Sequence, residues 1–105
     1  MSSGAGEASA GGFVVLGDAW RYEGALTLDN AALVMAHLET LPLPASGRVD
    51  MGGVAHADSS ALAILMALRR RGLAEGRALS FENLPAALHS LAIVYGVDEL
   101  TRGTP

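Results

Sequence analysis

The chain contains no cysteine and no lysine, and only five of its 105 residues are aromatic. The absence of cysteine excludes disulfides, thiolate metal ligands and cysteine nucleophiles. The acidic residues outnumber the basic ones by 11 to 7, which gives a formal net charge of −4. This balance argues against a protein that binds nucleic acid, or that docks on an anionic lipid surface through basic side chains.

Long apolar runs are also missing. The longest one, Ala61–Leu68, is far shorter than the about 20 residues that a membrane-spanning helix needs. The segment 1–12 has no positive charge and does not resemble a secretory signal, and with little to bury it is predicted to be a flexible tail. We therefore expect a cytoplasmic protein without direct membrane insertion. It has one domain over residues 13–100 and a frayed end over residues 101–105.

Runs of β-branched and aromatic residues predict four strands, over residues 13–16, 19–27, 47–51 and 77–81. The short turn Gly17–Asp18 makes the first two strands a hairpin, and the second strand could break at Gly24. The pair Gly52–Gly53 is expected to end the third strand.

Apolar residues at helical spacing predict three helices. The first has Asp29 as its N-cap and continues to Leu41, before Pro42 and Pro44 stop it. Its apolar positions are Ala31, Val34, Met35, Leu38 and Leu41.

The second helix has the clearest pattern. Asp58 is its predicted N-cap, and Gly72 or Gly76 its predicted end. Arg69, Arg70 and Arg71 are assigned to its last turn, where cations complement the helix dipole. Its buried stripe is expected to consist of Ala61, Ile64, Leu65 and Leu68.

The third helix is predicted to start at Pro85 and to have Gly96 just past its end. Residues 97–100 could add a final short turn. Its expected apolar face consists of Leu88, Leu91, Ala92 and Tyr95. The alternation of strands and helices indicates an α/β fold, with a small mixed sheet of about four strands and three helices packed on it.

Catalytic and nucleotide-binding patterns are weak. His37 and His89 have no ligand partner at helical spacing, so they are interpreted as surface residues and no metal site is expected. His56 lies near Asp58 and two serines, but catalytic triads are assembled from distant segments, and a serine hydrolase is the least favoured alternative. The strand-to-helix glycines Gly52–Gly53 lack the lysine of a phosphate-binding loop. We predict no catalytic residue and no cofactor.

The start and the outer flank of the second helix remain as the candidate site. Asp58, Ser59 and Ser60 lie in its first turn, and capping alone would explain them. The flank that follows is small and nearly uncharged, whereas a solvated helix face usually carries charges. The predicted partner-binding residues are Asp58, Ser59, Ser60, Ala63, Met66 and Arg70.

The segment 49–63, VDMGGVAHADSSALA, resembles the central signature of the STAS family, in which a strand ending in VDLSGV precedes DSSGL or DSAGL at a helix start. The ending of the chain is similar to that of the MlaB-like branch. It runs from Phe81-Glu82-Asn83-Leu84-Pro85 to Tyr95-Gly96-Val97-Asp98-Glu99-Leu100. The resemblance covers about residues 13–100. It departs from the family pattern at Ala61, where many members have glycine.

This resemblance implies a STAS-like fold and a non-enzymatic adaptor. Its partner would be the MlaF-like ATPase subunit of a phospholipid-transporting ABC system that maintains outer-membrane lipid asymmetry, which would place the protein at the inner membrane through the complex. The key hydroxyl of the family falls on Ser59. The alternative is an anti-anti-sigma factor that binds an anti-sigma factor kinase and is switched by phosphorylation, whose site matches Ser60, with Ser59 as the second possible site.

Overall fold

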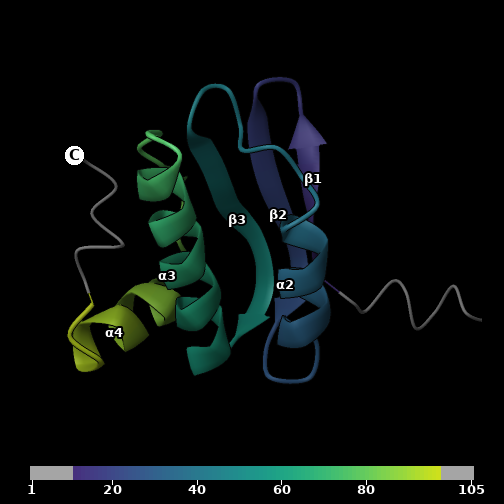
Figure 1. The fold of residues 1–105 in the computed structure, drawn as a ribbon. Helices are drawn as coiled ribbons and strands as arrows, with labels where there is room; N and C mark the ends of the chain where they lie inside the picture. Colours follow the sequence, from purple (N-terminus) through teal and green to yellow (C-terminus); the bar gives the residue numbers. More distant parts are fainter. Residues whose placement is uncertain (1–10, 98–105) are drawn as a thin grey trace, which may run out of the picture.

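A computed structural model describes residues 11–97, which form a four-stranded sheet with helices packed on it (Figure 1). The predicted tail, apart from Gly11 and Gly12, and the predicted frayed end and final turn, apart from Val97, lie outside the described residues. The order of elements is β1 (Gly12–Leu16), β2 (Ala19–Leu26), α2 (Ala31–Leu38), β3 (Arg48–Ala57), α3 (Ser59–Ala74), β4 (Ser80–Glu82) and α4 (Ala86–Val94). The predicted order and α/β class are confirmed.

The strands follow the order β1-β2-β3-β4, so β1 and β4 form the two edges of the sheet. β1 and β2 are antiparallel, and β3 is parallel to both β2 and β4. The predicted hairpin is therefore confirmed. Gly17 occupies the left-handed region at φ 62°, which suits the first central position of a two-residue hairpin turn.

The third strand differs from its prediction, because β3 continues through Gly52–Gly53 to Ala57. The reason is the close approach of β2 at this point. A Cβ atom on Gly53 would lie 2.3 Å from the carbonyl oxygen of Tyr22. The register between β2 and β3 shifts here, and Gly24 of β2, at φ 99°, lies beside a second shift. These glycines allow the two backbones to pack together and do not end the strand.

The first helix begins later and ends earlier than predicted. Its N-cap is Asn30 rather than Asp29. The side-chain amide of Asn30 accepts a hydrogen bond from the backbone N–H of Thr27 and donates one to the carbonyl oxygen of Ala25, which fixes the start of the helix at this residue. The helix ends at Leu38, before Leu41. Arg71 of α3 donates hydrogen bonds to the carbonyl oxygens of Leu38 and Leu41, at 3.0 and 2.7 Å, and so holds the end of α2 against α3.

α3 begins after Asp58 as predicted and continues to Ala74, so that Gly76, at φ 72°, follows its end and Gly72 lies inside it. Because α3 ends at Ala74 and not before Gly72, only Arg71 of the three arginines lies in its last turn. The assignment of Arg69 and Arg70 to that turn was wrong. The predicted inner stripe of α3 is buried.

α4 has Pro85 as its N-cap and Gly96, at φ 73°, just past its end. Leu88 and Ala92 of its predicted apolar face are buried and Leu91 is half-buried, whereas Tyr95, the C-cap, is exposed, so its assignment to the buried face was wrong. The fourth strand, predicted at 77–81, is shorter and covers only Ser80–Glu82.

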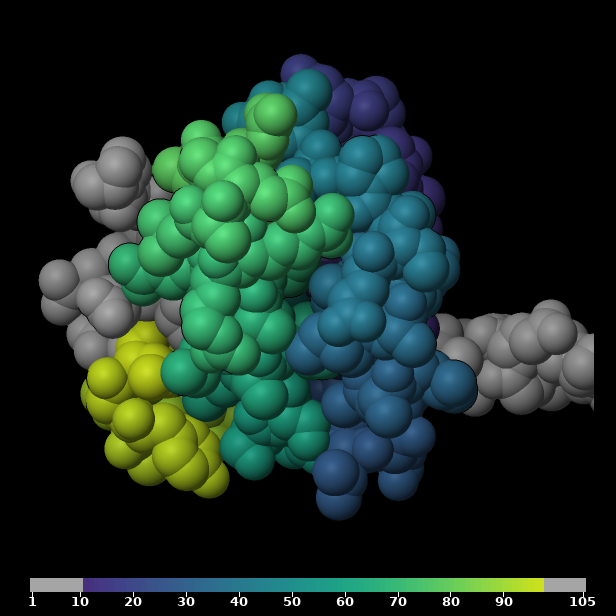
Figure 2. All heavy atoms as spheres, viewed as in Figure 1, coloured from purple at the N-terminus to yellow at the C-terminus, as the bar shows by residue number. Residues whose placement is uncertain are grey.

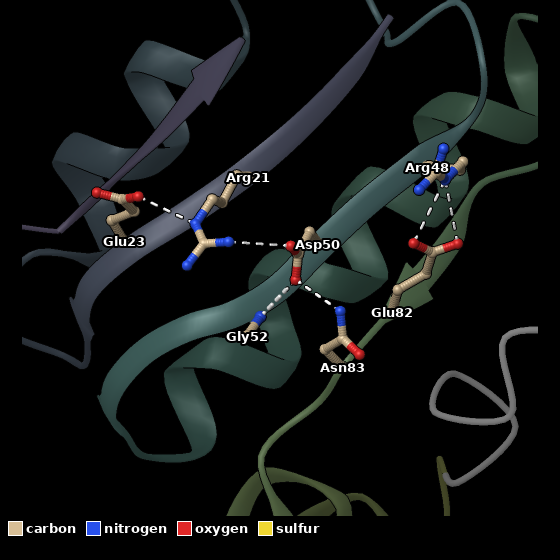
Figure 3. Close-up of polar contacts among 7 residues, drawn as sticks. All are labelled: Arg21, Glu23, Arg48, Asp50, Gly52, Glu82 and Asn83. Atoms are coloured by element: carbon tan, nitrogen blue, oxygen red, sulfur yellow. Dashed lines mark hydrogen bonds and ion pairs between the residues drawn. The ribbon is translucent and has the colours of Figure 1, made fainter. Parts of the chain in front are cut away.

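The core lies between the sheet and the helices. In the view of Figure 1, α2 and α3 lie side by side in front of the sheet, and α4 lies next to α3. Alternate residues of the central strands are buried beneath the helices, among them Trp20, Tyr22, Val49 and Met51. The intervening polar residues are on the opposite face of the sheet, which no described helix covers (Figure 3). This arrangement leaves the outer side of α3 at the surface (Figure 2).

Candidate functional site

The candidate site begins where β3 passes directly into α3. Asp58 is the single residue between the two elements, and its extended backbone, at φ −128° and ψ −168°, turns the chain into the helix. Its carboxylate oxygen Oδ1 accepts a hydrogen bond from the backbone N–H of Ser60 at 2.8 Å. This contact is the N-cap that the sequence predicts, and it satisfies one of the free donors of the first turn.

The second carboxylate oxygen of Asp58 binds another part of the chain. Oδ2 accepts a hydrogen bond from the backbone N–H of Leu28 at 3.0 Å. The bond from Leu28 is the main reason that the pKa of Asp58 lies below its ordinary value, and the bond from Ser60 lowers the pKa further. Asp58 is therefore held as a carboxylate that links the start of α3 to the loop before α2.

The two serines differ in accessibility. Ser59 is exposed at the first position of α3, whereas Ser60 is half-buried. Ser59 is thus accessible to solvent at the start of the helix.

The predicted outer flank lies on the surface, as its helical spacing requires. Ser59, Ala63 and Arg70 are exposed, and Met66 is half-buried against the core. Leu73 continues the same stripe one turn further and is 66% exposed. We define these five residues as the α3 flank.

The structure adds a residue that the sequence analysis missed. Leu28 is bonded through its backbone to Asp58, and its side chain is 77% exposed. The bond places the backbone of this exposed leucine at the start of α3. No local pattern indicates this neighbour, because Leu28 and Asp58 are 30 residues apart.

A second polar cluster occupies the open face of the sheet, away from α3 (Figure 3). Arg21 forms ion pairs with Glu23 and with Asp50, at 3.0 and 3.2 Å. Asp50 Oδ1 accepts hydrogen bonds from the backbone N–H of Gly52 and from the side chain of Asn83. The bond from Gly52 is the main reason that the pKa of Asp50 lies below its ordinary value, and the bond from Asn83 lowers the pKa further.

This cluster has a structural role. Asn83 has a left-handed backbone at φ 57°, and its bond to Asp50 ties the segment between β4 and α4 to the centre of the sheet. Arg48 pairs with Glu82 at 3.3 Å across β3 and β4. Both arginines of the cluster are thus paired with carboxylates, three in all.

The three histidines do not meet. His37, His56 and His89 are exposed on α2, β3 and α4. Within residues 11–97, no three His, Asp or Glu side chains are grouped so that they could hold a metal ion. In the same range, none of the helices has the length and apolar character to cross a bilayer.

The fold and the site together define a class. The molecule is a small α/β domain in which a parallel strand leads through an aspartate and two serines into a surface helix. Residues 21–102 match the family described as MlaB, STAS domain, and the chain therefore belongs to the STAS domain family in its MlaB-like form. A search of curated proteins found no significant match.

Proposed function

We propose that the protein is a non-enzymatic adaptor that binds the ATPase subunit of a phospholipid-transporting ABC system through the α3 flank and Asp58, Ser60 and Leu28. Membership of the MlaB-like STAS family supports a regulatory or adaptor role. Within such a role, the α3 flank is the docking surface and the ATPase subunit is the partner. It places the protein in the cytoplasm, at the inner membrane through the complex.

The exposed start of α3 carries this proposal. Leu28 and Leu73 are exposed at opposite ends of the surface, and Ser59 and Ala63 between them have small side chains. A helix or loop of a partner can approach such a surface closely, because no bulky charged side chain stands in the way over its first turns. Arg70 adds a cation for an acidic residue of the partner, and Met66 adapts its shape to the contact.

The adaptor acts by preferring one state of the ATPase. A bound domain shifts the equilibrium between two ATPase conformations only by the difference between its affinities for them. The rigid attachment of the docking surface serves this purpose. Asp58 fixes both the helix start and the Leu28 loop, so that their relative positions do not have to be ordered on binding.

Affinity capture with the full-length chain tests the proposal. The bait is compared with Ala63→Arg, which puts a bulky cation at an exposed position of the docking surface, and with Val94→Arg, a matched change of an exposed residue on α4. The expected result is an ABC-transporter ATPase, identified by mass spectrometry, that binds the unaltered chain and Val94→Arg but not Ala63→Arg.

One outcome would favour the other STAS function. Recovery of an anti-sigma factor kinase without an ABC ATPase would contradict the proposed partner. In that case, phosphate on Ser60 or Ser59 of the recovered chain would indicate a switch, because a phosphate adds about two negative charges to the docking surface.

A further inference from the structure

The edge strand β1 has features that the proposed function leaves unexplained. It pairs only with β2 among the described strands, so one of its sides is open. Val14, Val15 and Leu16 are 43%, 49% and 53% exposed, respectively. Figure 1 shows β1 at the border of the sheet, on the far side of β2 from α3. This edge is therefore separate from the docking surface.

The exposure of Val15 is unexpected for its position. Side chains alternate along a strand, so Val15 points to the same face as Phe13, which is only 4% exposed. The helices cover Phe13 but leave Val15 uncovered. Both faces of β1 are thus apolar and accessible near the hairpin, where a half-buried strand would alternate between buried and exposed residues.

β1 also lacks the usual protection of an edge. Natural edge strands carry charges, prolines or bulges that prevent pairing with another chain. The strand Gly12–Leu16 contains no charged residue and no proline, and its register with β2 is regular. The strand is therefore open to pairing with a further strand.

The hydrogen-bond pattern defines which groups face outward. A two-residue turn is closed by a hydrogen-bonded pair, here Leu16 and Ala19, and such pairs alternate along an antiparallel ladder. Val14 therefore bonds to β2, and the N–H and C=O groups of Phe13 and Val15 point to the open side. No described residue bonds to these groups.

We propose that this edge binds a second copy of the chain, through antiparallel pairing of the two β1 strands about a twofold axis at Val14. Phe13 of each copy exchanges hydrogen bonds with Val15 of the other. Val14 faces its own equivalent in a non-hydrogen-bonded pair, in which side chains lie close together. Each exposed Val15 then lies opposite a phenylalanine.

Self-complementarity selects a second copy over another partner. In a twofold contact, the same patch serves both sides, so that apolar residues meet apolar residues without a matching sequence elsewhere. β1 brings no charges that would repel one another. β1 has only five residues, against about 20–30 residues a side in a stable interface, so we expect a weak dimer that depends on concentration.

Sedimentation of the full-length chain over about a hundredfold range of concentration measures this association. We expect a reversible monomer–dimer equilibrium. Val14→Glu and Val14→Arg each place two like charges on the axis, and each should weaken the dimer about tenfold. A one-to-one mixture of these variants should restore association, because the opposite charges then face each other. Val94→Glu changes an exposed residue of α4 and should leave the dimer unchanged.

The mixture identifies Val14 as the residue on the axis. A chain that stays monomeric at every concentration overturns the proposal. So does a dimer whose dissociation constant is the same in Val14→Glu, in Val14→Arg and in the unaltered chain. Single variants that dissociate but do not associate when mixed overturn the twofold register. Ser59→Glu, at the tip of α3, should not affect dimerisation, so failure of this proposal and failure of the ATPase partnership are distinguishable.

Discussion

One carboxylate, that of Asp58, bonds to the backbone N–H of Leu28 at 3.0 Å and to that of Ser60 at 2.8 Å. The aspartate of the family signature thus caps its own helix and also fixes a loop from another part of the chain. The backbone of Leu28, whose side chain is exposed, is held at the start of α3 as a result.

Asp58→Ala should lower the free energy of unfolding by about 1–2 kcal/mol, because it removes the N-cap and leaves the N–H of Leu28 without its acceptor. Urea unfolding followed by circular dichroism measures the change. Asp29→Ala is the matched control. Asp29 lies outside α2 and is exposed, so its removal should change stability by less than about 0.5 kcal/mol. Equal effects of the two changes would contradict the role assigned to Asp58.

Tyr22 makes stability depend on alkaline pH. Its side chain is fully buried and donates a hydrogen bond to the carbonyl oxygen of Ala25, and burial raises its pKa from 10.0 to about 12. The unfolded chain therefore loses this proton first. The protonated Tyr22 hydroxyl contributes fully to the free energy of unfolding below pH 10. This contribution is lost as the pH rises toward 12, and the free energy of unfolding falls by roughly 3 kcal/mol at most.

Urea titrations between pH 9 and 12 should show this decrease, and Tyr22→Phe should flatten it. The chain has no lysine or cysteine that would titrate in the same interval. An unchanged pH slope in Tyr22→Phe would contradict the assignment of the decrease to this hydroxyl.

Gly53→Ala should destabilise the sheet by about 1–3 kcal/mol, because the new methyl group would lie 2.3 Å from the carbonyl oxygen of Tyr22 and force β2 and β3 apart. Gly12→Ala is the control within the same sheet, since a Cβ there meets nothing within 4 Å. The urea midpoint should fall for Gly53→Ala and stay or rise for Gly12→Ala. Similar midpoints would show that β3 does not need glycine at position 53.

Gly53 also illustrates what the sequence could and could not predict. α3 and its inner stripe were predictable because capping by Asp58 and the helical spacing are local. The length of β3 was not, because glycines often end strands, and only the approach of Tyr22 shows that this one lies between two strands. Similarly, Leu28 joins the candidate site through a contact across 30 residues that no local pattern encodes.

The outer flank of α3 was predictable for the same reason as its inner stripe. Once the buried stripe is assigned, the opposite side of the helix follows from its geometry, and Ser59, Ala63 and Arg70 are exposed as expected. Leu73 was missed because the helix was assigned a possible end at Gly72. The ends of elements depend on tertiary contacts more than their centres do.

Ser59→Glu tests the docking surface most directly. Ser59 is exposed at the first position of α3, where an acidic side chain is compatible with the helix dipole, so the fold and the thermal midpoint should be retained. The added charge, next to the carboxylate of Asp58, should abolish binding to the ABC-transporter ATPase, measured by titration calorimetry with the purified partner. Ser90→Glu introduces the same charge on exposed α4 and should bind normally. Unchanged affinity of Ser59→Glu would remove the start of α3 from the interface, whereas loss of binding by both variants would indicate a general effect of negative charge on this already acidic chain.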